Sequence, residues 1–186
     1  MGLDYAAAAA DLDCDVAAIA AVAEVEAAGS GMNPDGRPKI LFEAHLFHAL
    51  TGGRFGTSHP HLSSKAWNRK LYAKTQTGEW DRYTAAAGLD ARAAMQATSW
   101  GRFQILGRNH KACGYTTPEA FVADMMAGEA AHLRAFVAFL KTNKLDVPLR
   151  AHDWAAFARG YNGPRYAENK YDRKMAEAWR RLTPSA

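Results

Sequence analysis

The sequence predicts a mainly α-helical single domain, residues 1–186, with a small β-hairpin or an irregular excursion beside a cleft. Apolar residues recur at helical spacing through most of the chain, which is typical of helices packed on a shared core. Residues 51–76 interrupt that pattern with many Gly, Ser, His and Lys residues, as expected of an excursion or a hairpin. No internal repeat or linker is visible, and 186 residues suffice for one hydrophobic core.

The individual elements follow from periodicity and from residues that begin or end helices. Residues 39–50 fit either a strand that continues as a helix or a helix throughout, and residues 98–107 are expected to form a turn and a short apolar helix. The longest helix is expected at residues 116–143, where Thr116 and Glu119 fit a capping box. The other expected helices are residues 5–12, 15–31, 80–97, 154–159 and 166–182.

The charge and the cysteines restrict the function only in part. A formal net charge of +4 draws a protein to anionic polymers, which include nucleic acid, membrane surfaces and bacterial cell wall. The charge does not choose between these partners. Cys14 and Cys113 form no CxxC pattern, and we expect two free, buried thiols rather than a disulfide.

The N-terminal residues resemble a signal peptide only superficially. Residues 6–10 are all alanine, but a basic n-region is missing and Asp4, Asp11 and Asp13 interrupt the apolar run. We therefore expect neither a signal peptide nor a transmembrane helix. A protein made in the cytoplasm in this way would need another release route to act outside it.

The helix expected at residues 15–31 carries an acid on its apolar face. Ile19, Val22 and Ala23 lie seven, four and three positions before Glu26, so all four share one side of the helix. Burial and the negative end of the helix dipole both disfavour a charged carboxylate there, so they raise its pKa. A carboxyl that keeps its proton near neutral pH can serve as a general acid. The alternative is a glutamate that turns outward to water.

A second acid, Glu43, has apolar neighbours in either the strand or the helix interpretation of its segment. It follows Glu26 by 17 positions, across a Gly-rich turn. This spacing allows two consecutive elements to fold back and to direct both carboxylates into one cleft. Most glycoside hydrolases cleave the glycosidic bond with a pair of carboxyl groups. Many other proteins also have two glutamates with apolar neighbours, so the pairing alone is weak evidence.

Two glycine-punctuated segments could bind a ligand. One offers Ser99, Trp100 and Gln104, and the other offers Tyr161 and Asn162. Aromatic rings stack on sugar faces, while amides and hydroxyls hydrogen-bond to hydroxyl and N-acetyl groups. The alternative for each segment is a helix-ending turn with an aromatic residue in the core.

The histidines suggest a rival metal site, which we do not expect. His45 and His48 lie near Glu43, but their spacing is not the HExxH arrangement of zinc enzymes, and no cysteine joins them. His45 is instead expected to hold the Glu43 region by hydrogen bonding, while His59 and His61 are expected on a loop surface. We predict no metal and no cofactor.

Four segments together carry a family resemblance. VEAAGSG at 25–31, GRPKILFEAH at 36–45, SWGRFQI at 99–105 and FARGYNG at 157–163 resemble the N-acetylmuramidase domain of bacteriophage endolysins. That domain belongs to the lysozyme-like superfamily, so the resemblance implies an α+β lysozyme-like fold. The likeness runs from about residue 11 to residue 179, and the four motifs are specific only in combination and in this order.

The resemblance implies a peptidoglycan hydrolase that cleaves the β-1,4 bond between N-acetylmuramic acid and N-acetylglucosamine. The family's catalytic glutamate corresponds to Glu26 and its second acid to Glu43, which would either activate a water or support the developing positive charge. Gln104 is then expected near the cleft and Tyr161 beside the acid. The resemblance further implies a single-domain monomer without a separate wall-binding module, acting on the wall in the periplasm after release.

Two other functions remain open from the sequence. A lytic transglycosylase would use one acid and form a 1,6-anhydro product without water. A non-catalytic basic module would bind glycan or nucleic acid and form no product, although no segment resembles a nucleic-acid-binding fold. Basic residues near the C-terminus could contact an anionic wall or outer membrane, or could form a solvated helix face: Arg173, Lys174, Arg180 and Arg181.

Overall fold

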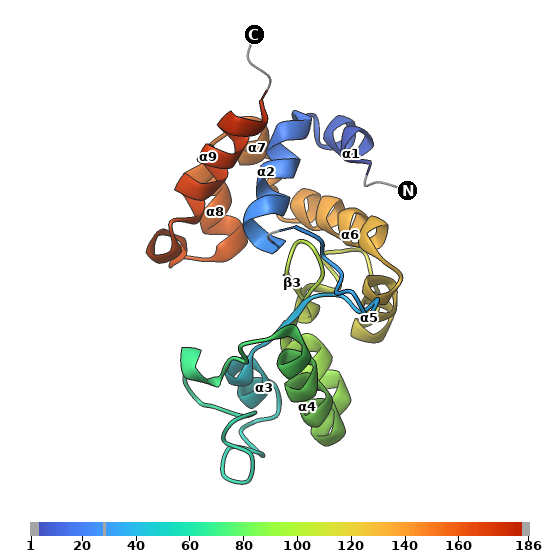
Figure 1. Ribbon diagram of the computed structural model, residues 1–186, viewed down its shortest axis with the longest axis vertical. Helices are drawn as coiled ribbons and strands as arrows, with labels where there is room; N and C mark the ends of the chain where they lie inside the picture. Colours follow the sequence, from blue (N-terminus) through green and yellow to red (C-terminus); the bar gives the residue numbers. More distant parts are fainter. Residues whose placement is uncertain (1–3, 28, 184–186) are drawn as a thin grey trace.

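The computed structural model describes residues 4–27 and 29–183, which form two lobes with a small sheet between them (Figure 1). The helices of the upper lobe in this view are α1 (Tyr5–Leu12), α2 (Val16–Ala27), α6 (Glu129–Thr142), α7 (Asp146–Arg150), α8 (Trp154–Asn162) and α9 (Tyr171–Leu182). The lower lobe contains α3 (Ala44–Leu50), α4 (Gln76–Gln96) and the excursion at residues 51–75. Between the lobes lie β1 (Ile40–Phe42), β2 (Thr98–Trp100), β3 (Ile105–Leu106) and α5 (Pro118–Met126). Three short 3-10 helices complete the described elements, η1 (Arg69–Leu71), η2 (Gly107–Asn109) and η3 (Tyr166–Asn169).

Helix α2 is the centre of the upper lobe. Its sequence is apolar on nearly all sides, a pattern typical of a helix that is buried all round. Ile19 and Val22 are fully buried, and α2 packs against α1 and α9. The Asp15 carboxylate accepts a hydrogen bond from the backbone N–H of Ala18 at 2.8 Å, as expected of a residue that caps this helix.

The sheet has the antiparallel order β1-β2-β3, and it corrects one expectation. Residues 98–107 form a β-hairpin followed by η2, not a turn and an apolar helix. Gly101 and Gln104 have φ values of 69° and 47°, and these left-handed conformations turn the chain back on itself. A Cβ atom added to Gly101 would lie 2.6 Å from the ring of His132, so only glycine fits this turn.

The strand-then-helix interpretation of residues 39–50 is confirmed by β1 and α3. The excursion that follows is irregular, and its described residues contain turns and η1 but no strand. It has a small core of its own, in which the Phe55 ring stacks on Phe47 with centroids 5.7 Å apart and Leu62 is 1% exposed. The His48 ring bonds to the Ser63 hydroxyl at 3.0 Å.

The expected helix at residues 116–143 is two helices, α5 and α6, and the single-helix prediction is wrong. The break comes at Gly128, whose φ of 124° no helix can accommodate. The cap is also one residue later than expected, because the Thr117 side chain accepts from the N–H of Ala120. The periodicity continued across the break because both helices face the same core.

Both cysteines are free thiols, as expected; Cys113 is buried and Cys14 is half-buried. Burial raises the pKa of Cys14 to about 11 and that of Cys113 to about 12, so both stay protonated and unreactive at neutral pH. Among the described residues, no helix has the length and apolar character needed to cross a membrane.

Candidate active site

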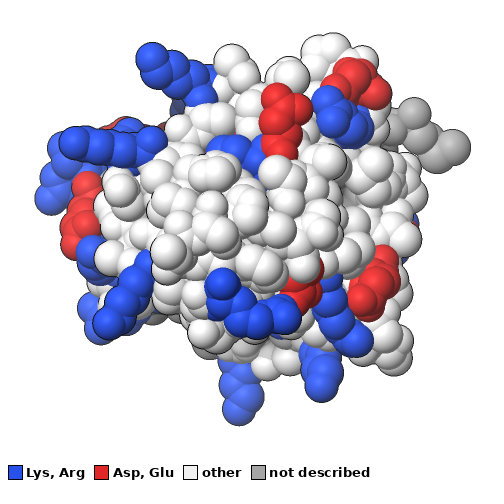
Figure 2. Space-filling view, turned by 90° about the horizontal axis from the view of Figure 1, so that it is seen from below, with Lys and Arg blue, Asp and Glu red and all other residues white. Residues whose placement is uncertain are grey.

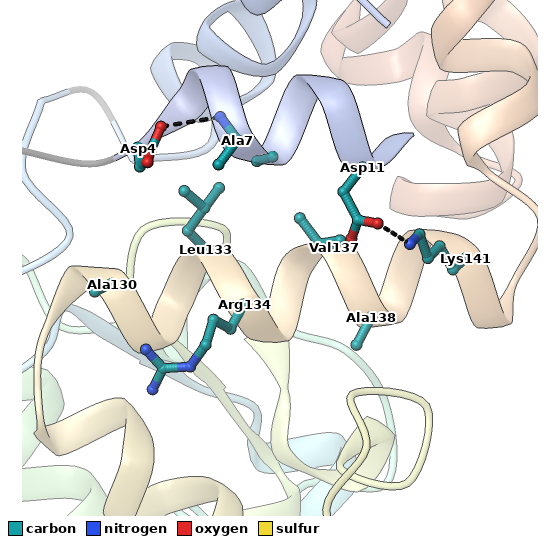
Figure 3. A pocket seen from close by; sticks show the side chains of 10 residues that line it. Asp4, Ala7, Asp11, Ala130, Leu133, Arg134, Val137, Ala138 and Lys141 are labelled. Atoms are coloured by element: carbon teal, nitrogen blue, oxygen red, sulfur yellow. Dashed lines mark hydrogen bonds and ion pairs between the residues drawn. The ribbon is translucent and has the colours of Figure 1, made fainter. Parts of the chain in front are cut away.

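One large surface hollow, of about 650 Å³, lies between α1 and α6 (Figure 3). Its walls are mainly aliphatic, with Leu133 and Val137 among the lining side chains. Its charged residues sit at the margin, where Asp11 pairs with Lys141. Among its described lining residues the two acids, Asp4 and Asp11, lie at opposite ends of the hollow and do not face each other (Figure 3), so they form no acid–base pair.

A smaller cavity of about 320 Å³ lies between the two lobes and contains both acids singled out in the sequence. The upper lobe contributes Glu26, and the sheet side contributes Glu43. The remaining lining residues combine polar and apolar side chains: Leu41, Ser99, Gln104, Ile105, Leu106, Asn109, Phe139, Tyr161, Asn162 and Tyr171. Such a concave site with a few convergent polar groups is the kind that binds a ligand.

Glu26 lies in the last turn of α2 and opens onto this cavity. Burial raises its pKa from an ordinary value near 4.5 to about 7, in the direction expected from the sequence. The Asn162 side-chain amide donates to Glu26 Oε1 at 2.8 Å, and this bond together with the charge of Lys174 opposes the rise. Near neutral pH a large share of Glu26 therefore carries a proton.

Glu43 occupies the point where β1 ends and α3 begins, and its side chain is 16% exposed. The Tyr72 hydroxyl donates to Glu43 Oε2 at 2.7 Å, and the His45 Nδ1 atom lies 3.2 Å from the same oxygen. Burial raises the pKa of Glu43, while the Tyr72 hydrogen bond, His45 and Arg82 act in the opposite direction. These partners favour the ionised form, so Glu43 is better suited than Glu26 to carry a negative charge.

A buried acid behind Glu43 fixes the strand that leads into it. Glu79 on α4 is 2% exposed and accepts from the N–H groups of Phe42 and Ala73 at 3.0 and 2.6 Å. Arg82 pairs with the same carboxylate at 2.9 Å and donates to the Phe42 carbonyl at 3.2 Å. Because Phe42 directly precedes Glu43, this network sets where the Glu43 backbone lies.

The histidines do not form a metal site in the described part of the chain, which holds no group of three His, Cys, Asp or Glu side chains able to bind one ion. His45 instead contacts Glu43, as expected, and His48 bonds to Ser63.

The β2–β3 hairpin brings two of its three expected residues to the cavity. Ser99 lines it, and within the described residues its hydroxyl has no protein partner. Gln104 also lines it, with its amide nitrogen bonded to the Gly101 carbonyl at 2.8 Å. Trp100 does not line it: the side chain is 1% exposed, and its ring packs edge-on against Trp80. Trp100 is therefore a core residue and cannot stack on a sugar.

Helix α8 supplies the two expected residues of the second glycine-punctuated segment. Asn162 holds Glu26, as described above. The Tyr161 hydroxyl donates to the Phe103 carbonyl at 2.6 Å, which joins α8 to the hairpin turn. Burial and the neighbouring Glu26 raise the pKa of Tyr161, so it stays a neutral hydrogen-bond donor.

A family model described as N-acetylmuramidase matches residues 15–183. This chain belongs to the N-acetylmuramidase family. Among solved structures, it is similar to the crystal structure of Burkholderia AP3 phage endolysin, with 41% sequence identity and a TM-score of 0.85 over 96% of this chain and 68% of that one. No curated protein matches the chain.

Family membership explains the cavity. The muramidase is a glycoside hydrolase of the lysozyme type, and peptidoglycan is its substrate. The expected α+β lysozyme-like fold is confirmed by the match to the endolysin structure, by the predominance of helices and by the small antiparallel sheet. The sequence motifs therefore identified the family correctly.

Sequence reasoning missed several residues around the muramidase cavity. Leu41 shares a strand side with Glu43, so the strand interpretation alone could have placed it there. Tyr72 contacts Glu43 from the irregular excursion, and no periodicity marks such a contact. Asn109, Phe139 and Tyr171 reach the cavity from three different elements, which only the tertiary fold brings together.

Replacing Asn162 with leucine is expected to move the alkaline limb of the muramidase pH profile upward. That limb of kcat/KM reports the loss of the general acid's proton. The Asn162 hydrogen bond lowers the pKa of Glu26, so removing the bond leaves the effect of burial less opposed and raises that pKa. Lys174→Met should shift the limb in the same direction, and this shift should shrink at high salt because Lys174 is exposed.

The matched control is Arg159→Met, which removes an exposed positive charge from the same helix as Asn162 without touching Glu26. Its alkaline limb should coincide with that of the unmodified protein. A limb that stays in place or moves to lower pH in Asn162→Leu would contradict the role given to this hydrogen bond.

Proposed function

We propose that this muramidase acts as an endolysin that cleaves the β-1,4 bond between N-acetylmuramic acid and N-acetylglucosamine, with Glu26 as general acid. One observation carries this proposal: a single cavity holds two carboxyl groups in different environments. Burial raises the pKa of both carboxyl groups, to about 7 at Glu26, while at Glu43 the Tyr72 hydrogen bond, His45 and Arg82 oppose the rise. Two such carboxyl groups can divide the acid and base roles between them.

Glu26 would protonate the glycosidic oxygen as the bond breaks. A carboxyl with a pKa of about 7 is protonated often enough to react at neutral pH, yet it gives up its proton far more readily than water. The Asn162 amide bonds to one carboxyl oxygen and so fixes the orientation of the group. The other oxygen is then free to face the leaving group.

Glu43 would act on the opposite side of the reaction. Its Oε2 atom is engaged by Tyr72 and His45, whereas Oε1 has no hydrogen bond within the described residues. That free oxygen can accept a proton from an attacking water, or its charge can stabilise the oxocarbenium-like transition state. Either role requires the negative charge that Tyr72 and His45 favour.

The remaining cavity residues would position the glycan. The Ser99 hydroxyl can bond to a sugar hydroxyl or an N-acetyl group, and the Gln104 carbonyl oxygen can accept a hydrogen bond while its amide nitrogen holds the hairpin turn. Tyr161 lines the cavity, and its hydroxyl is bonded to the backbone of the hairpin turn. We therefore retain Ser99, Gln104, Tyr161 and Asn162 as site residues.

Digestion of purified peptidoglycan, with mass spectrometry of the soluble products, tests this function. The expected fragments end in a reducing N-acetylmuramic acid, because water adds to the broken bond. A 1,6-anhydro end, lighter by one water molecule, would identify a lytic transglycosylase instead. A protein that binds the wall but releases no fragment would be a non-catalytic binding module.

We also propose that the enzyme is a monomer, made in the host bacterial cytoplasm and active in the periplasm after release. Contact with an anionic wall or outer membrane would involve the exposed basic residues of α9, namely Arg173, Lys174, Arg180 and Arg181. Arg181 already pairs with Glu24, which reduces its share. On the lower face, basic side chains lie spread around a broad uncharged centre rather than in one patch (Figure 2).

A further inference from the structure

Trp67 is the most exposed of the tryptophans that the structure describes. Its side chain is 49% exposed, whereas Trp80, Trp100 and Trp154 are buried with at most 8% exposed. Trp67 shares a small depression with Glu43, His45 and Tyr72, immediately beside the cavity between the lobes. Its exposure shows that this ring is not a core residue, although it lies close to an acid of the site.

Hydrogen bonds connect this ring to an acid of the site. The indole N–H of Trp67 donates to the Tyr72 hydroxyl at 2.7 Å, and that hydroxyl donates to Glu43 Oε2 at 2.7 Å. The Tyr72 ring also packs edge-on against the indole, with centroids 6.3 Å apart. The position of the indole and the position of the Glu43 carboxylate are therefore linked through one residue.

The face of the indole is covered by a residue from the other lobe. The guanidinium carbon of Arg165 lies 5.8 Å from the centre of the Trp67 ring. Arg165 lies three residues after Asn162, just before η3, whereas Trp67 lies in the excursion of the lower lobe; both segments are on the left in Figure 1. The pair thus connects the two lobes close to Glu43.

The Arg165 side chain is easily displaced from this position. It is 69% exposed, and its ion pair with Glu168 is long, at 4.0 Å. A guanidinium group is attracted to an indole face by the electron-rich π system. The same face attracts the C–H groups of a sugar ring, which also carry partial positive charge. A pyranose ring is therefore a suitable replacement for the guanidinium.

We propose that Trp67 is a sugar-binding residue that extends the cleft past Glu43, with its indole stacking on a ring of the glycan strand in place of Arg165. This inference rests on the proposed function, because a glycan strand longer than the cavity must continue beyond the two acids. Bound sugar fixes the indole, the indole N–H fixes the Tyr72 hydroxyl, and that hydroxyl fixes Glu43. Tyr72 is thus a positioning residue, through which substrate length affects the acid.

Binding is measured first, in a Glu26→Gln background so that nothing is cleaved, by titration calorimetry with soluble oligomers of N-acetylglucosamine and N-acetylmuramic acid. Adding Trp67→Ala should weaken binding by about tenfold, whereas Trp67→Phe should retain most of it because a ring remains. Leu50→Ala is the matched control, since Leu50 is an exposed apolar residue of the same lobe. It should bind like the background protein.

Turnover is measured second, with proteins in which Glu26 is unchanged. Trp67→Phe removes the donor to Tyr72 but keeps a ring, so kcat should fall several-fold while KM changes little. Tyr72→Phe should give the same split between kcat and KM, with a larger fall in kcat. An unchanged kcat in both variants would show that Tyr72 does not link sugar binding to Glu43.

Two binding results would overturn the stacking role itself. In the first, the Trp67→Ala protein binds the oligomers as tightly as the background protein does. In the second, the Trp67→Phe protein binds as weakly as the Trp67→Ala protein. That result would show that the loss of affinity comes from the lost N–H donor and not from the lost ring. Because binding is read without cleavage, failure of the proposed hydrolysis would leave these results interpretable.

Discussion

Replacing Glu26 with glutamine is expected to lower kcat for peptidoglycan cleavage by about 10³-fold. Glutamine has nearly the same shape, and its carbonyl oxygen can still accept the hydrogen bond from Asn162. It has no proton to give to the leaving oxygen, so the chemical step loses its acid while the cavity keeps its form. The measurement is the rate of release of reducing ends from purified peptidoglycan.

The same variant should be more stable than the unmodified protein at alkaline pH. In the unmodified protein the folded-state pKa of Glu26, about 7, lies above the ordinary value near 4.5, so the folded state holds this proton more tightly than the unfolded state does. Stability is therefore lost as pH rises from 4.5 towards 7, and it stays reduced above that range. Glutamine cannot ionise and avoids the loss, which is about 3 kcal/mol.

Thermal unfolding at acid and alkaline pH checks this second result and shows that the inactive variant is folded. The stabilising effect should be present at about pH 8 and absent at about pH 4. A Glu26→Gln protein that releases reducing ends at a rate near that of the unmodified protein would rule out Glu26 as the general acid.

Glu43→Gln is expected to have the second largest effect, a loss of about 10²-fold or more in kcat. The substitution removes the negative charge that would activate water or stabilise the transition state, although the amide oxygen can still accept the hydrogen bond from Tyr72. The acidic limb of the pH profile should disappear as well. In the unmodified protein that limb should lie above the pH typical of a glutamate, because burial raises the pKa of Glu43.

Glu24→Gln is the matched control for both substitutions. Glu24 is an exposed glutamate on the same helix as Glu26, and it pairs with Arg181 far from the cavity. It should keep both kcat and the shape of the pH profile. If Glu43→Gln keeps its acidic limb, the group that titrates there is a different one, and Glu43 has another role.

The helical lobe was predictable from the sequence because its signals are local. The apolar face of α2, the capping Asp15 and the acid on the buried side all follow from spacing along one helix. The hairpin at residues 98–107 was not predictable in the same way. Its strands are only two and three residues long, and pairing with β1, which is distant in sequence, makes them strands.

The candidate site was predictable in its acids and less so in its supporting residues. Glu26 and Glu43 could be found because an acid among apolar residues is conspicuous in any sequence. Trp100 misled because an aromatic residue beside a glycine has the same appearance in a ligand site and in a core, and burial decides between them. Tyr72 and Trp67 lie in irregular backbone, where no period indicates which way a side chain points.

The two acids are held by different lobes, so the distance between their carboxyl groups depends on how the lobes are joined. Glu26 is fixed by α8 of the upper lobe, and Glu43 by Tyr72 and His45 of the lower lobe. The hairpin turn joins the lobes, because Phe103 stacks on Phe136 of α6 with centroids 4.0 Å apart and accepts the Tyr161 hydrogen bond. The packing at this turn therefore helps to set the separation of the two carboxyl groups. A substitution that loosens this packing would be expected to lower activity by shifting the two acids relative to each other, without altering either acid or its immediate surroundings.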